Sequence, residues 1–179
     1  MKTLILEIYQ MSPLWLCVLC AAASLGLCLL DHRLCSRCWW RVLIVAALSL
    51  WAVAVLYVTV LSRDSGAHGV FHLIPLHSYR EVLATGNREI LRSSFMNGLL
   101  FFPAGLLGAV LLPRKRRSIL RLILAAALFS LAIELLQFRL SLGNTEMDDI
   151  LHNTMGTLLG AWGYGLAHTL YSSGRKPMQ

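Results

Sequence analysis

The stretch Ile119–Phe138, ILRLILAAALFSLAIELLQF, decides the class of fold to which this chain belongs. It is 20 residues long and mostly apolar, which is the length and composition that an α-helix needs to cross a bilayer. Near its end it carries Glu134, and Gln137 follows one turn later. A carboxylate at that depth is costly unless it is paired, hydrated or protonated, so Glu134 is a candidate site residue.

Other long apolar stretches accompany this one in a chain of 179 residues, of which 57% are hydrophobic and 14% charged. The connections between them are too short to form a separate soluble domain. We therefore predict an all-α, polytopic transmembrane helix bundle, a single membrane domain over residues 1–179. The five predicted spans are Pro13–Leu30, Val42–Leu61, Phe95–Leu112, Ile119–Phe138 and Ile150–Tyr171.

The first apolar stretch has a second interpretation, a cleaved signal peptide that would leave four spans. Its preceding segment carries only Lys2 against Glu7, and its apolar run continues past the alanines at 21–23. Both observations favour a retained span.

The net charge of +7 is distributed unevenly over the connections. Ten of the 16 basic residues lie in the 31–41 connection, in the 113–121 region and in the C-terminal tail, which alternate along the chain and so share one side of the membrane. The positive-inside rule then predicts an N-terminus outside and a C-terminus in the cytoplasm. We expect these clusters to contact lipid headgroups, with no nucleic acid as partner.

The long connection 62–94 is predicted to form an external interfacial loop. Its segment Val70–Leu76 is too short to span and too apolar for water, so it should lie in the interface. The segment Tyr79–Leu91 is predicted to form a short amphipathic helix broken at Gly86 and Asn87.

Glycines in the last span predict where it packs. Gly156 and Gly160 form a G-x-x-x-G pattern, which lets helices approach closely in lipid. We expect the last span to lie in the middle of the bundle.

Polar residues near the outer ends of three predicted spans should lie at similar depth, and the short connection 139–149 makes the last two spans neighbours. We expect a cluster that binds a ligand and is formed by Glu134, Gln137, Asp148, Asp149, Asn153 and Asn97.

Crowded carboxylates of this kind cannot all stay ionised without a compensating charge. A proton, a basic side chain such as Arg92 or Arg139, or a hard divalent cation would supply it. Purely structural roles are the alternative: Asp148 or Asp149 would cap the last helix, and Glu134 would hold two helices in register.

We predict no protein-bound metal or other cofactor. Cys35 and Cys38 form a C-x-x-C pattern, but a zinc site of this kind requires a second ligand pair that the sequence lacks.

Several motifs, in order, resemble the VanZ-like family over roughly residues 57–165. Asn97–Gly105 resembles its "N-x-L-x-F-x-P-x-G" segment, Ser130–Gln137 its "S-x-x-x-E-x-x-Q" helix, and Glu146–Gly156 its "D-x-D-D-x-x-x-N-x-x-G" signature. Leu73–Leu76 resembles its "L-I-P-F" loop. The first acid of the signature is Glu146 instead of Asp, and the arginine that often precedes it is missing.

The resemblance implies a small integral protein of the bacterial inner or plasma membrane, within the cell envelope. Its partners would be membrane lipids and an amphiphilic antibiotic or a lipid-linked envelope precursor. The founding member is associated with low-level teicoplanin resistance, so we expect lowered susceptibility to lipophilic glycopeptides through headgroup or amphiphile binding.

Two other functions stay open at this point. One is a membrane-embedded enzyme that acts on a lipid-linked envelope substrate, with Glu134 and Asp149 as general acid and base. The other is an assembly or scaffold protein that uses the glycine-rich last span as its partner surface. The lack of a nucleophile motif favours binding over catalysis.

Overall fold

The computed structural model of the protein describes residues 38–63, 71–113, 115–142 and 145–173. The predicted span Pro13–Leu30 and the residue Cys35 lie outside them. The described elements are α3 (Cys38–Leu56), which continues into the π-helical turn η1 (Tyr57–Leu61), β1 (Phe71–His72), α4 (His77–Thr85), α5 (Arg88–Leu111), α6 (Arg116–Arg139), β2 (Thr145–Glu146) and α7 (Met147–Ser173).

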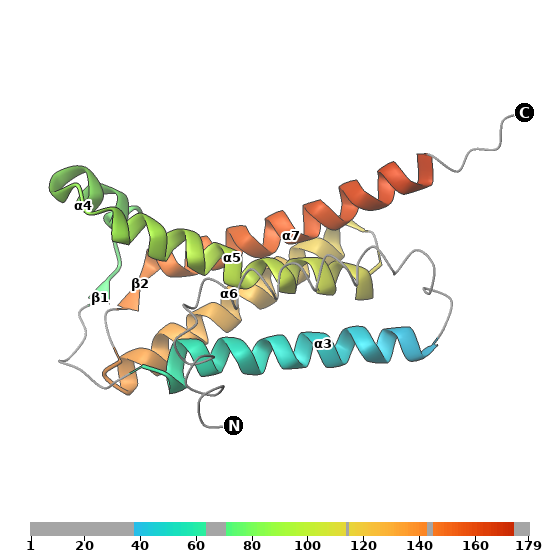
Figure 1. Cartoon of the computed structure of the whole chain (residues 1–179), viewed down its shortest axis with the longest axis horizontal. Coiled ribbons are helices and arrows are strands. Elements are labelled where there is room, and N and C mark those ends of the chain that lie inside the picture. The colour runs from blue at the N-terminus through green and yellow to red at the C-terminus, as the bar shows by residue number, and fades with distance from the viewer. Residues whose placement is uncertain (1–37, 64–70, 114, 143–144, 174–179) are drawn as a thin grey trace, which may run out of the picture.

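Long helices account for most of the described chain, which confirms the predicted all-α class for these residues (Figure 1). Three of the described helical segments are long and apolar enough to cross a membrane: Trp39–Leu61, Arg88–Leu111 and Arg116–Arg139. α7 has 27 residues but falls outside that group. Its sequence is rich in glycine and polar residues, so its role as a fourth described span stays a prediction.

The connection 62–94 is more helical than the predicted interfacial loop with one short amphipathic helix. α4 ends at Gly86, which adopts a left-handed backbone with φ of 70°, and Asn87 begins α5 by accepting a hydrogen bond from the backbone of Glu89. The break predicted at Gly86 and Asn87 is therefore present, but α5 starts at Arg88, seven residues before the predicted start at Phe95. An asparagine cap with an acid in the first turn favours a helix start there, and this local signal extends the helix beyond its apolar part.

The helices α3, α5, α6 and α7 run between the same two ends of the molecule (Figure 1). One end collects η1, α4, the short strands, the end of α6 and the start of α7, and we call it the polar end. There β1 and β2 pair in parallel, with Phe71 opposite Thr145 and His72 opposite Glu146.

α3 joins the bundle through an aromatic core. Trp51 donates a hydrogen bond of 2.8 Å to the carbonyl of Leu100, and its ring meets that of Phe101 edge-on at 5.4 Å between centroids. Val55 and Ile133 belong to the same buried cluster. A tryptophan buried with its N–H satisfied fixes both the position and the rotation of α3 against α5.

Many large apolar side chains face outward along the helices. In water such a continuous apolar surface would drive association, whereas lipid accommodates it without cost. Members of this surface with more than half of their area exposed include Val42, Leu50, Val53, Leu124, Leu128, Met155, Trp162 and Leu170.

α5 and α7 approach so closely that their backbones touch at the glycines. A Cβ at Gly156 would overlap the carbonyl of Gly98, and a Cβ at Gly160 would overlap the carbonyl of Phe102. A Cβ at Gly105 would meet the carbonyl of Thr157 in the same way. α7 therefore packs against α5 without space for any side chain at these positions, which agrees with the central place expected from the G-x-x-x-G pattern.

Gly160→Ala tests this contact directly. The added methyl group forces the two helices apart, and we expect a loss of about 1–3 kcal/mol of stability, the usual cost of overpacking. Thermal unfolding of the purified protein in detergent measures the loss. Gly165→Ala is the matched control, because a Cβ there meets nothing within 4 Å. Equal melting temperatures for the two variants would contradict the packing described.

Candidate functional site

The polar end brings three of the predicted site residues, Glu134, Asp149 and Asn97, into one connected group with Glu146. Glu134 is 3% exposed, near the end of α6, and its carboxylate accepts a 3.2 Å hydrogen bond from the backbone N–H of Glu146. Asp149, in the first turn of α7, is close enough to Glu134 for their charges to interact. Asn97 of α5 donates a side-chain hydrogen bond to Asp149. We call Glu134, Glu146, Asp149 and Asn97 the acid cluster.

The charge of one described arginine reaches this cluster. Arg63 follows η1, and its positive charge acts on both Glu134 and Asp149. The predicted charge partners are placed differently: Arg92 forms an ion pair of 3.2 Å with Glu89, and Arg139 is exposed at the end of α6. Sequence reasoning missed Arg63 because 71 residues separate it from Glu134, and no local pattern indicates that they meet.

A second pair of polar residues continues the cluster one turn deeper. Asn153 lies four residues after Asp149, and Ser130 lies four residues before Glu134, so each pair shares a helix face. Asn153 donates a 2.8 Å hydrogen bond to Ser130, and both side chains are buried. The Asn153 side-chain oxygen has no hydrogen-bond partner within the described structure. This leaves one buried acceptor available beside the carboxylates.

The hydrogen bond of Gln137 is made outside the acid cluster. Its amide donates a 2.7 Å hydrogen bond to the backbone carbonyl of Thr59, in η1. Gln137 thus ties α6 to the end of α3, where the π-helical turn leaves carbonyls that need donors. This contact accounts for the buried glutamine in an apolar helix, so no ligand is needed to explain it.

Asp148 caps a helix, but not the helix that sequence reasoning named. Its carboxylate accepts hydrogen bonds from the backbone N–H groups of Leu76 and Ser78, at the start of α4. Ser78 in turn donates from its hydroxyl to Glu146 at 3.0 Å. The first turn of α7 therefore caps α4 instead of itself, which fixes α4 over the polar end.

Asp148 precedes the predicted span Ile150–Tyr171, and its ionisation follows from these contacts. Burial alone would raise the pKa of Asp148, but the hydrogen bonds from Ser78 and Leu76 outweigh burial and hold the pKa below its ordinary value. Asp148 is therefore a carboxylate at neutral pH and serves as a structural anion.

Two hollows open at this end on different sides of α5. One, of about 400 Å³, lies between η1 and α5 and reaches the acid cluster through Arg63 and Asn97; Val58, Met96 and Leu100 form its apolar wall. The other, of about 380 Å³, lies between α5 and α7 and is mostly apolar. At its rim the Tyr79 hydroxyl and His152 Nε2 are 2.8 Å apart.

No three histidine, cysteine, aspartate or glutamate side chains within the described ranges are placed to share a metal ion. His72 and His77 stack with ring centroids 4.3 Å apart, and neither is paired with the acid cluster. The chemistry that the polar end offers is therefore charge and hydrogen bonding toward a polar group.

The fold and the acid cluster together define a helical membrane protein with a buried polar end. A family model described as VanZ/LLP1 matches residues 39–168, so the chain belongs to the VanZ/LLP1 family. The match begins at the start of α3 and ends in α7, and it includes every residue of the acid cluster. No curated protein and no solved structure matches this chain.

Asp148→Asn tests the cap of α4. The variant keeps the side-chain shape but loses the negative charge, and hydrogen bonds to charged groups contribute about 1.5–3 kcal/mol. We expect amide hydrogen exchange over residues 76–85 to accelerate by about tenfold or more, while the rest of the bundle is unaffected. Glu89→Gln, which removes an exposed carboxylate outside α4, should leave exchange over residues 76–85 unchanged.

The pH dependence of this contact has a definite sign. Because folding lowers the pKa of Asp148, its stabilising effect is fully present above the unfolded value, about 3.9. The effect is lost as the pH falls through the lower folded value. Protection of α4 that decreased between pH 7 and pH 5 would contradict the assignment.

Proposed function

We propose that this protein binds an amphiphile of the outer leaflet, through a cationic or polar headgroup, at the acid cluster. By occupying or altering that surface it lowers the susceptibility of the bacterial cell to lipophilic glycopeptides. The observation that carries the proposal is the meeting of Glu134 and Asp149 with Asn97 and Arg63 at the end of an otherwise apolar bundle.

The charge balance of the cluster favours a cationic group. Three carboxylates, those of Glu134, Glu146 and Asp149, interact with one another, and the opposing charges in the same set of interactions are those of Arg63 and, at Asp149, His152. Asp148 is already satisfied by the backbone of α4. A headgroup that brings a positive charge would relieve the repulsion that remains.

The hollow between η1 and α5 provides a route for such a group. Its polar lining includes Arg63, Arg92, Ser93 and Asn97, and Val58, Met96 and Leu100 form its apolar wall. A lining with both polar and apolar parts suits a ligand with a polar head and a hydrocarbon body. The arginines would accommodate a phosphate next to the cationic group of that head.

The position of the polar end supports a ligand that resides in the membrane. Leu73, Ile74 and Leu76 are each more than half exposed beside the cluster, and Leu83 projects from α4 with 88% of its area exposed. Exposed apolar side chains beside a polar site are typical of a surface in the membrane interface. The distribution of basic residues in the sequence predicts that this end lies at the outer face.

The test uses bacteria that depend on this protein for lowered teicoplanin susceptibility. Glu134→Gln and Asp149→Asn keep the side-chain shapes and remove one negative charge each, and we expect both variants to lose the protective effect. Growth inhibition by teicoplanin is the measurement, with membrane levels of each variant determined by immunoblot. Glu81→Gln is the matched control and should protect like the unaltered protein. Full protection by both cluster variants at normal protein levels would contradict the proposal.

A further inference from the structure

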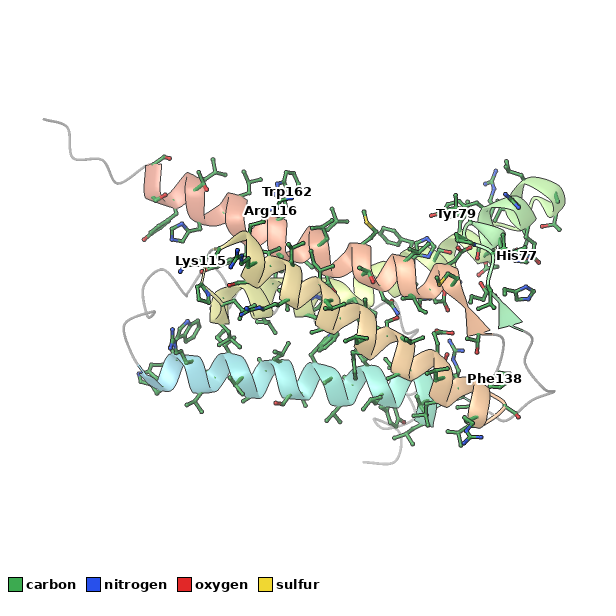
Figure 2. All side chains as sticks on the ribbon, turned by 180° about the vertical axis from the view of Figure 1, so that it is seen from behind. His77, Tyr79, Lys115, Arg116, Phe138 and Trp162 are labelled. Atoms are coloured by element: carbon green, nitrogen blue, oxygen red, sulfur yellow. The ribbon has the colours of Figure 1, made fainter. Side chains whose placement is uncertain are left out.

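A third hollow lies far from the acid cluster, at the opposite end of the molecule. It has a volume of about 520 Å³ and lies where the start of α6 faces the second half of α7. Figure 2 shows Lys115, Arg116 and Trp162 together at this end, with His77 and Tyr79 at the other end. The hollow is within the range of about 300–1,000 Å³ that is usual for ligand sites.

The wall of this hollow is mainly hydrocarbon and aromatic. Ala109 of α5 and Ile119 of α6 contribute on one side, and α7 contributes Leu158, Ala161, Trp162 and Leu166. Trp162 is 66% exposed and Leu166 47%, so both extend outward toward the predicted lipid phase. An apolar groove that opens on lipid admits an acyl chain from the side.

Two cations stand at one end of the groove. Lys115 and Arg116 line it directly and are exposed, and neither forms an ion pair with any described residue. The lining contains no aspartate or glutamate, and the first turn of α6 has no acidic residue. The charge of this groove is therefore uncompensated by any residue that the structure describes.

We infer that this groove binds an anionic phospholipid, with the phosphate between Lys115 and Arg116 and one acyl chain along Trp162 and Leu166. The charge selects an anionic headgroup over a zwitterionic one, and the apolar wall selects a lipid over a free anion. Basic pockets between helices on the predicted cytoplasmic side are suited to the anionic lipids of that leaflet. The inference is independent of the function proposed for the acid cluster.

The experiment is native mass spectrometry of the full protein in detergent, mixed with equal amounts of phosphatidylglycerol and phosphatidylcholine of the same chain composition. Each basic residue near a membrane surface contributes about 1 kcal/mol of attraction to anionic lipid. We therefore expect the unaltered protein to retain phosphatidylglycerol with a preference of about tenfold or more. The double variant Lys115→Gln/Arg116→Gln should reduce that preference to less than about threefold.

Two further variants separate the groove from general charge and from headgroup contact alone. Arg80→Gln/Arg88→Gln removes the same charge from the polar end, where both arginines are exposed, and should keep the preference. Trp162→Ala/Leu166→Ala changes no charge and should lower the retention of phosphatidylglycerol severalfold, because the wall for the acyl chain is lost. Circular dichroism and gel filtration confirm that each variant is folded.

Three results would overturn the inference. An unaltered preference for phosphatidylglycerol in Lys115→Gln/Arg116→Gln would show that the two cations do not bind the headgroup. An equal loss in Arg80→Gln/Arg88→Gln would show that net charge alone attracts the lipid. Unchanged retention in folded Trp162→Ala/Leu166→Ala would show that no acyl chain lies in the groove.

Discussion

The backbone contact between α5 and α7 is the constraint on which the rest of the structure depends. Gly98 meets Gly156 without an intervening side chain, and Asn97 precedes Gly98 directly. The contact therefore fixes the depth of Asn97 relative to the first two turns of α7, where Asp149 and Asn153 lie. A helix pair separated by ordinary side chains would lie 8–10 Å apart between axes and would not define this register so strictly. The acid cluster thus depends on glycines that contribute no side chain to it.

The polar end is held in place by long-range contacts that close over the bundle. Asp148 binds the start of α4 across 70 residues of sequence, and the strand pair joins residues 71–72 to residues 145–146. These bonds keep a loop of the chain above α7 and leave its apolar side chains facing outward. A membrane protein gains from this arrangement, because backbone groups near the interface must find partners when water is scarce.

Local sequence signals predicted the helices and the break between α4 and α5, because apolar length and caps act within a few residues. The meeting of Glu134, Asp149 and Asn97 also followed from sequence, since depth along predicted spans and a short connection were enough to align them. Three features did not follow: the strand pair, the cap that Asp148 provides for α4, and the approach of Arg63. Each of these joins segments that are more than 60 residues apart, and neither periodicity nor composition specifies which distant backbone group a side chain reaches. The hydrogen bond of Gln137 was not predicted either, because its partner lies in a π-helical turn that no sequence pattern indicates.

The candidate site depends most on the convergence of carboxylates from α6 and α7 within an apolar bundle. A crystal structure grown from a lipidic mesophase, where hydrocarbon surrounds the helices, measures that convergence directly. We predict that the Glu134 carboxylate lies near Asp149 and Glu146, that Asn97 lies within hydrogen-bonding distance of Asp149, and that Arg63 lies near both acids at the end of η1. A map in which Glu134 projects into lipid, or in which α6 and α7 separate these residues, would contradict this prediction.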